Sequence, residues 1–257
     1  VMASRWGYEA IAVKQYNGNP YTKDMFPFEM VKSEAKYRNT YWRPEVESLI
    51  DITSQYLDNP DDPQTETLPY KLQVLRHAFA TEKFLSKQFE GRLDELFDVK
   101  TYSKEKAQEL KAAVVALKPL YTAQLLRASE SIDSVNYVIK KSLPEGETIG
   151  QYKDQYFNER LYSIMQNEAS EDKFVNERGM LIQVMDPGFQ EPLQAGPLNY
   201  RAHFYAPIKH FAGMRIDTLT FNMIMIWFMT AIFYVALYYE WIAKFIGFLG
   251  NLGKKER

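Results

Sequence analysis

The longest apolar run of the chain lies near its C-terminus, at residues 218–239. This run, TLTFNMIMIWFMTAIFYVALYY, contains no Asp, Glu, Lys or Arg. As a helix it would be about 33 Å long, which matches a bilayer hydrocarbon core of about 30 Å. The alternative is a buried helix in a large soluble core, where so long an uncharged run is unusual. The pattern therefore predicts a transmembrane helix within residues 211–243.

Basic residues on the two sides of this run predict its orientation. Those that follow it are Lys244, Lys254, Lys255 and Arg257. Lys209 and Arg215 precede it, so the asymmetry is modest. Because Lys and Arg close to a span mark its cytoplasmic side, we expect residues 244–257 to form an interfacial or cytoplasmic tail. The residues before the span are then extracytoplasmic.

Upstream, two long stretches repeat apolar residues at helical spacing. The first covers residues 69–97 and the second residues 104–142, with Ser103 as a candidate N-cap. Pro119 is expected to kink or split the second helix. Since a short loop joins the two stretches, we expect them to form a long antiparallel helical hairpin.

Shorter patterns complete an all-α prediction. Apolar spacing, proline positions and a Thr148–Gln151 capping box predict further helices at residues 1–16, 28–38, 44–57 and 148–167. Met180 to Val184 is a candidate short strand. We expect a membrane-proximal helix at 1–16 and an extracytoplasmic helical domain at 17–210. The predicted fold class is thus an all-α membrane protein with one C-terminal span and a helical outer domain.

Composition narrows the class of protein. The 257 residues are 46% hydrophobic and 25% charged, with a net charge of −2, which suits a globular domain plus one membrane anchor. A nucleic-acid-binding protein would carry a basic patch, so we expect no nucleic-acid partner. Without cysteine, neither disulfides nor thiolate metal sites are possible.

The sequence offers no catalytic, cofactor or metal motif. The histidines are His77, His203 and His210. None has a metal-ligand spacing, although a gating or lipid-headgroup contact is an alternative for the last two. The acidic loop with Asp58, Asp61 and Asp62 lacks the glycine and terminal Glu of an EF-hand. The glycine-rich segment 247–255 departs from phosphate-loop spacing. We expect no enzyme active site in this chain.

Two of the three charged residues in the mainly apolar segment at 1–16 are spaced to pair with each other. Arg5 and Glu9 are four residues apart and can pair along one helix face. If the segment lies at the membrane, such charges are costly and are usually paired or functional. The alternative is an interfacial helix whose charges contact water. Arg5 and Glu9 are therefore a candidate gating or structural pair.

The run RWGYEAI at residues 5–11 resembles a motif of the White-like (ABCG) type-2 ABC transporter permeases. In that family the motif begins a helix that is followed by an extracellular segment, the last transmembrane helix and a short basic tail. Residues 201–207 and 216–219 also resemble large Bacteroidetes-type transporters, which carry an ATPase and a permease on one chain.

The resemblance implies the C-terminal part of an ABC exporter permease in a bacterial inner membrane. ATP and Mg²⁺ would bind an ATPase domain outside this segment, and the partners would be lipid, upstream transmembrane helices and a second copy in a homodimer. The chain begins at Val1 without a signal peptide, so we expect either a processed protein or a piece of a longer one. The alternative function is a single-pass, membrane-anchored helical ectodomain that acts as an envelope binding or scaffold protein.

Overall fold

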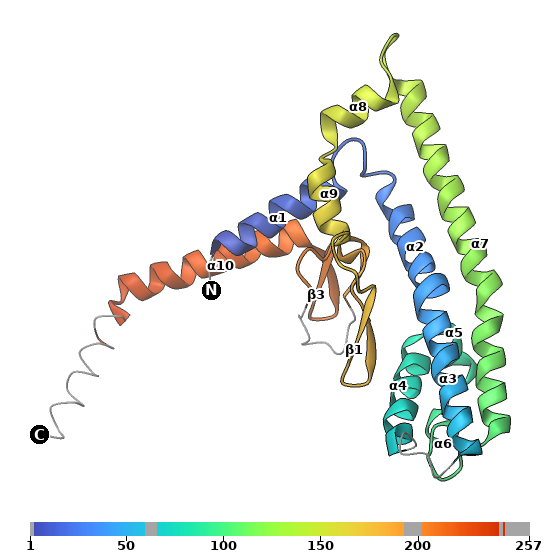
Figure 1. The fold of residues 1–257 in the computed structure, drawn as a ribbon. Helices are drawn as coiled ribbons and strands as arrows, with labels where there is room; N and C mark the ends of the chain where they lie inside the picture. The colour runs from blue at the N-terminus through green and yellow to red at the C-terminus, as the bar shows by residue number, and fades with distance from the viewer. Residues whose placement is uncertain (1–2, 60–65, 193–201, 242–243, 245–257) are drawn as a thin grey trace, which may run out of the picture. The chain divides into compact units, whose positions relative to one another are not determined.

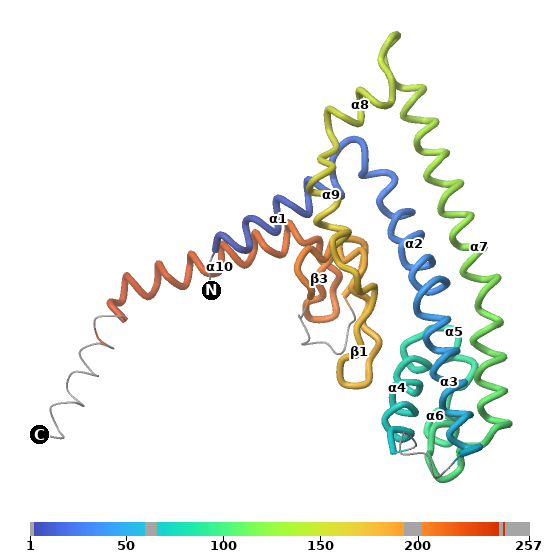
Figure 2. Tube along the Cα trace, viewed as in Figure 1, coloured from blue at the N-terminus to red at the C-terminus, as the bar shows by residue number. Residues whose placement is uncertain are grey.

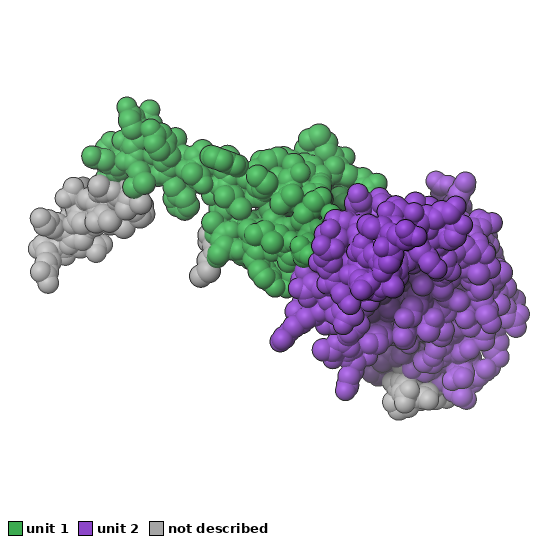
Figure 3. Space-filling model, turned by 90° about the horizontal axis from the view of Figure 1, so that it is seen from above, with its two compact units in different colours: residues 1–18, 191–257 green, residues 19–190 purple. Residues whose placement is uncertain are grey.

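A computed structural model describes residues 3–59, 66–192, 202–241 and 244. The chain divides into two compact units, which Figure 3 distinguishes by colour. Unit 1 combines residues 1–18 with 191–257, and unit 2 comprises residues 19–190. Residues 191–210, which we expected in the outer domain of residues 17–210, thus belong with the apolar C-terminal helix. The two parts of unit 1 are the flanks of an inserted unit 2.

Helices make up most of the described residues, as predicted. The elements of unit 2 are α2 (Phe26–Tyr37), the π-helical η1 (Arg38–Trp42), α3 (Arg43–Asp58), α4 (Leu68–Thr81), α5 (Lys83–Gln88), α6 (Leu93–Leu96), α7 (Lys104–Ser142), α8 (Ile149–Tyr156), α9 (Glu159–Gln166), β1 (Phe174–Glu177), β2 (Met180–Gln183) and the short 3-10 helix η3 (Pro187–Phe189). Those of unit 1 are α1 (Ala3–Asn17), β3 (Ile208–Phe211), β4 (Met214–Asp217) and α10 (Thr218–Tyr238).

The central feature of unit 2 is a long antiparallel helical pair (Figure 1). One member is α7, and the other is the continuous run of α2, η1 and α3. Its polar contacts are Asn39 with Thr122, Asp51 with Lys111, and Asp58 with Lys104. As the residue number rises on one helix it falls on the other, which fixes the antiparallel direction.

The helix α7 has the predicted start and end. The Ser103 hydroxyl accepts a hydrogen bond from the Lys106 amide and caps the first turn. Of the two predicted effects of Pro119, a split of the helix is wrong, since α7 continues through it. Val115, whose carbonyl loses its hydrogen bond to the Pro119 nitrogen, lies on the exposed side of the helix, so water can satisfy that carbonyl.

The predicted single helix at 69–97 is wrong. This stretch forms α4, α5 and α6, and the first break is at Glu82, whose backbone is extended. The Glu82 carboxylate accepts hydrogen bonds from the Phe84 and Leu85 amides, which starts a new helix. The other Glu82 oxygen accepts a bond of 2.8 Å from the Tyr121 hydroxyl on α7. A buried cap therefore outweighs the apolar periodicity that runs across the break.

The hydrophobic core of unit 2 lies between the helical pair and α4 to α6. Its largest fully buried side chains are Trp42, Phe79, Phe89, Ile50, Leu72, Leu75, Leu85, Leu96 and Leu110. Phe79 packs against Phe89 and Phe97, with ring centres 5.7 and 5.3 Å apart. The short helices thus complete the core that a two-helix hairpin alone would leave open.

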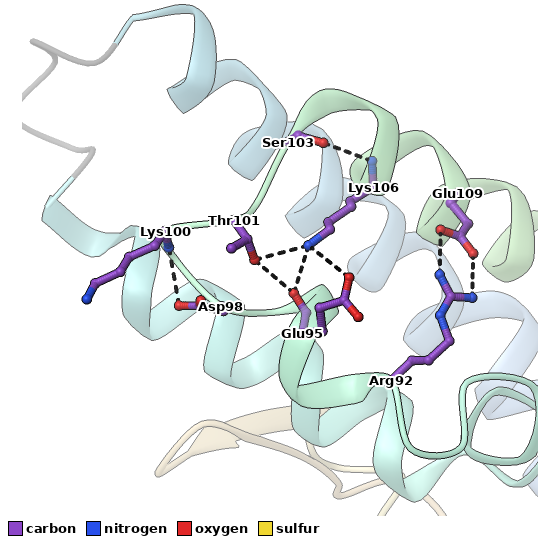
Figure 4. A network of polar contacts seen from close by, with 8 residues as sticks. All are labelled: Arg92, Glu95, Asp98, Lys100, Thr101, Ser103, Lys106 and Glu109. Atoms are coloured by element: carbon purple, nitrogen blue, oxygen red, sulfur yellow. Dashed lines mark hydrogen bonds and ion pairs between the residues drawn. The ribbon is translucent and has the colours of Figure 1, made fainter.

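A surface network holds α6 against the start of α7 (Figure 4). The Lys106 ammonium donates to the Glu95 carbonyl and the Thr101 hydroxyl, while Arg92 makes two bonds to the Glu109 carboxylate. Exposed ion pairs stabilise a fold by only about 0–1 kcal/mol each. The network therefore fixes the conformation of the loop between α6 and α7 more than it stabilises unit 2.

Two antiparallel hairpins were not anticipated as such, although β2 lies on the candidate strand at 180–184. β1 pairs with β2 and β3 with β4. Each hairpin closes with two left-handed residues, Arg178–Gly179 in the first and Ala212–Gly213 in the second. Such turns match the twist of the strands and favour glycine. The second hairpin matters for unit 1, because it leads directly into α10.

Figure 2 traces α1 alongside the first half of α10, in the opposite direction. Small and apolar residues of α1 are buried, namely Ala10, Ala12, Val13 and Tyr16. In α10 the first turns are buried at Thr218, Phe221 and Asn222, and most of the later apolar side chains are exposed. By length and composition, α10 is the one described helix able to cross a membrane.

Unit 2 should fold on its own, because all the residues of its hydrophobic core lie within the unit. A protein of residues 19–190 should give a helical circular-dichroism spectrum and one cooperative unfolding transition, both unchanged by EDTA. A dominant strand signal, or unfolding on addition of the chelator, would contradict this expectation.

The stability of unit 2 should fall as pH rises through the range 4.5 to 7. Burial raises the pKa of Glu29, on α2, from 4.5 to about 7, and the charge of Lys32 acts weakly in the opposite direction. In this range the unfolded chain has lost the Glu29 proton while the folded protein keeps it, so rising pH favours unfolding. Allowing for partial exposure, we expect a loss of about 2 kcal/mol.

Urea titrations of residues 19–190 at several pH values test this. Glu29→Gln should remove most of the loss between pH 4.5 and 7. The matched change Glu130→Gln, at an exposed position of α7, should retain the parent's dependence. An unchanged pH profile in Glu29→Gln would assign the effect to another group.

Candidate functional site

The most deeply buried ion pair of the described residues lies in unit 1. Glu9 is on the face of α1 that packs against α10, and Lys209 is on β3. Their side chains are 4% and 7% exposed. Asn222, in the second turn of α10, is fully buried beside them. We call Glu9, Lys209 and Asn222 the polar clamp, because they join three separate elements.

Every pair within the polar clamp is hydrogen-bonded. The Lys209 ammonium lies 2.6 Å from Glu9 Oε2 and 3.0 Å from Asn222 Oδ1. The Asn222 amide donates to the same Glu9 oxygen at 2.9 Å and to the Trp6 carbonyl at 3.1 Å. Asn222 thus bonds both charged groups and also holds the α1 backbone.

Aromatic rings enclose the ammonium group. Lys209 Nζ lies 4.8 Å from the Trp6 ring centre and 5.5 Å from that of Phe221. The ring faces carry partial negative charge, which attracts a cation, most strongly where water is excluded. The rings also exclude solvent from the ion pair between Lys209 and Glu9.

Electrostatics make this a costly arrangement. Burial lowers the pKa of Lys209 below its ordinary value of 10.5, while the hydrogen bond and charge of Glu9 act in the opposite direction. Removing two charges from water costs several kcal/mol per ion, which the attraction between them only partly offsets. Such a pair is therefore better explained by a need to fix α1, β3 and α10 in one register than by gain in stability.

The expected pairing of Glu9 with Arg5 is replaced by the pairing with Lys209. Arg5 is on the exposed side of α1, and its guanidinium carbon lies 5.4 Å from the Phe204 ring centre. The reason is geometric. Glu9 is on the face of α1 that packs against α10, where Lys209 of β3 bonds its carboxylate, whereas Arg5 is exposed. Arg5 and Glu9 thus both lie in unit 1, but Glu9 belongs to the buried ion pair and Arg5 contacts a ring at the surface.

A second charged group lies at the same hairpin. The guanidinium of Arg215, on β4, lies 2.9 Å from the Glu191 carboxylate. His210, opposite Arg215 in the strand register, places Nε2 3.3 Å from the same carboxylate. Glu191 thus ties the hairpin to the segment that enters unit 1 from unit 2.

The remaining candidates have structural surroundings. His77 Nδ1 lies 2.9 Å from the Gly179 carbonyl and fastens the β1–β2 turn to α4. Asp58 pairs with Lys104. Asp61, Asp62, the glycine-rich segment 247–255 and the basic residues after Lys244 lie outside the described residues. Within the described part, no three His, Cys, Asp or Glu side chains are grouped to hold a metal ion.

Sequence reasoning missed Lys209 and Asn222 as partners of Glu9. Lys209 entered only as a charge that flanks the span, and Asn222 only as one position of the uncharged run. The available signal was the isolation of each one, since a carboxylate, an ammonium and an amide in apolar surroundings all need partners. What the sequence does not contain is the β3–β4 register that brings them together.

Comparisons with known proteins found no matching family model, no matching curated protein and no matching solved structure.

Proposed function

We propose that this chain forms the C-terminal part of an ATP-driven ABC exporter permease, with α10 as its last transmembrane helix and unit 2 outside the membrane. The support for a span is the exposed apolar surface of α10, where Trp227 and Leu237 are 69% and 70% exposed. Contiguous apolar surface of this size needs lipid or a partner to cover it.

The polar clamp is the observation that carries the transport role. It fixes α1 to the outer end of α10 with a buried ion pair, at a cost that simple anchoring of a domain does not require. Unit 2 is connected covalently to this pair of helices at both ends. Movement of the membrane helices on ATP binding would therefore move α1 and α10 together, and it would reach unit 2 through the two chain connections.

The resemblance of residues 5–11 to the White-like permeases agrees with this role. That run lies at the start of α1. It supplies Glu9 of the polar clamp and Trp6, whose carbonyl accepts a hydrogen bond from Asn222. In the proposed transporter, upstream membrane helices lead into α1, and an ATPase domain elsewhere binds ATP and Mg²⁺. Two copies would form the transport path, as in the family.

ATP hydrolysis by the full-length gene product in nanodiscs tests the proposal. We expect vanadate-sensitive hydrolysis of Mg·ATP, and Glu9→Gln should lower it about tenfold, equivalent to about 1.4 kcal/mol, while the protein still accumulates. Glutamine keeps an acceptor for Lys209 but removes the charge. Absence of ATPase activity in the product and its co-purifying partners would exclude the transporter.

A second candidate is a membrane-anchored scaffold of the cell envelope. It is favoured by exposed apolar side chains on α7, namely Leu126, Tyr137 and Val138. In this case the encoding reading frame would place a signal peptide directly before Val1 and would lack upstream spans and a phosphate loop. The same ATPase measurement would then give no activity.

A further inference from the structure

The tip of the β3–β4 hairpin is apolar and exposed. Phe211 and Met214 flank the Ala212–Gly213 turn and are 50% and 58% exposed. Exposing such large apolar side chains to water is unfavourable. Because they lie beside the start of α10, the bilayer that would hold α10 can cover them.

A second exposed group lies around α1. The ring of Tyr8, which is 54% exposed, stacks on Phe204 at 6.3 Å and meets the edge of Tyr205 at 6.4 Å. The Tyr205 hydroxyl lies 3.5 Å from that of Tyr8. Arg5 stacks over Phe204 on the same group. Rings with polar ends and a cation are typical of the membrane–water interface.

Contacts with α10 place both groups at one level. Phe211 packs on Phe221, with ring centres 6.1 Å apart. Tyr8 precedes Glu9, which is bonded to Asn222. Exposed apolar side chains of α10 begin immediately after, at Met223. The two groups therefore surround the first turns of α10 and adjoin its exposed apolar surface.

The length of α10 fixes where this level lies. Its 21 residues make a helix of about 32 Å, against a hydrocarbon core of about 30 Å. Because the helix is barely longer than the hydrocarbon core, its first turns must lie at the outer boundary of the core. The residues beside these turns lie at the same depth.

We propose that these residues form a collar that seats in the phospholipid headgroups and upper acyl chains of the outer leaflet. The collar consists of Arg5, Tyr8, Phe204, Tyr205, Phe211 and Met214. Its apolar members contact the acyl chains, and the Arg5 guanidinium binds a lipid phosphate. In this position the collar keeps lipid and water away from the ion pair of Glu9 and Lys209. The proposal rests on the proposed membrane span of α10.

Depth-dependent fluorescence quenching tests the collar, because the chain has no native cysteine. The full chain is reconstituted in phosphatidylcholine nanodiscs with one environment-sensitive label at Met214→Cys or at Tyr8→Cys. Lipids carry a nitroxide either near the headgroup or deep in the acyl chain. Glu145→Cys in unit 2 and Ile232→Cys, at the fifteenth of the 21 residues of α10, serve as the exposed and the deep reference positions.

The collar predicts that both labels are quenched more by the shallow nitroxide than by the deep one, whereas the Ile232 label shows the reverse order. If either collar label is quenched no more than the Glu145 label while the Ile232 label is quenched, the collar proposal is overturned and the span stands. If the Ile232 label also escapes quenching, the span itself is wrong, and the collar falls with it.

Discussion

Lys209→Met should destabilise unit 1 by about 3 kcal/mol or more, because it leaves the Glu9 carboxylate buried without its counter-charge. Methionine keeps most of the unbranched apolar stem but removes the ammonium, and with it the ion pair with Glu9 and the cation–ring contacts with Trp6 and Phe221, so the loss is mainly electrostatic. Asn222 still donates one hydrogen bond to Glu9, but one amide replaces the solvation of a carboxylate only in part.

Thermal unfolding of the detergent-solubilised chain measures this effect, with proteolytic cleavage between the two units as the readout. For a unit of this size we expect the midpoint to fall by about 12–24 °C. The matched control is Arg5→Gln, which removes an exposed cation from the same helix and should change the midpoint little.

Double variants separate the partners of Glu9. Glu9→Gln combined with Lys209→Met should cost less than the sum of the single changes, because the two groups interact directly. Glu9→Gln combined with Arg5→Gln should be nearly additive. If the non-additive pair proved to be Glu9 with Arg5, the original sequence interpretation would be right and the polar clamp wrong.

The elements predicted well are those with a strong local signal. The uncharged run gave α10 to within one residue, and the cap at Ser103 gave the start of α7. The Thr148–Gln151 capping box is present at the start of α8. In each case the deciding interaction lies within a few residues, so the sequence contains all of it.

The partner of α7 depends on long-range packing and was predicted wrongly. Periodicity continues across Glu82, but the helix ends there because Tyr121, 39 residues later, helps to hold the buried carboxylate. Conversely, Pro44 was interpreted as a helix start, yet α2 passes into α3 through η1 without interruption. The extra residue of a π-turn shifts the register of the helix, and apolar spacing alone does not indicate it.

The polar clamp was half predicted. The isolation of Glu9 in an apolar segment correctly marked it as a paired residue, and the nearest cation in the sequence was assigned to it. Its partner is 200 residues away. Proximity along one helix is a weak guide when a hairpin such as β3–β4 can deliver a buried cation to the same face.

We propose that α10 crosses a membrane with unit 2 outside and the basic tail inside. Cysteine labelling in intact cells tests it without interference from native thiols, since the chain has none. Glu145→Cys lies in the exposed loop between α7 and α8, and Lys255→Cys lies in the tail. Both variants are exposed to a membrane-impermeant maleimide before and after the cells are permeabilised.

We expect an all-or-none difference in labelling between the two positions. The Glu145 position should react fully in intact cells, and the Lys255 position should react only after permeabilisation, because the maleimide cannot cross the hydrocarbon core that α10 spans. Labelling of Lys255→Cys but not of Glu145→Cys in intact cells would reverse the topology. Equal labelling of both positions in intact cells would contradict the span itself.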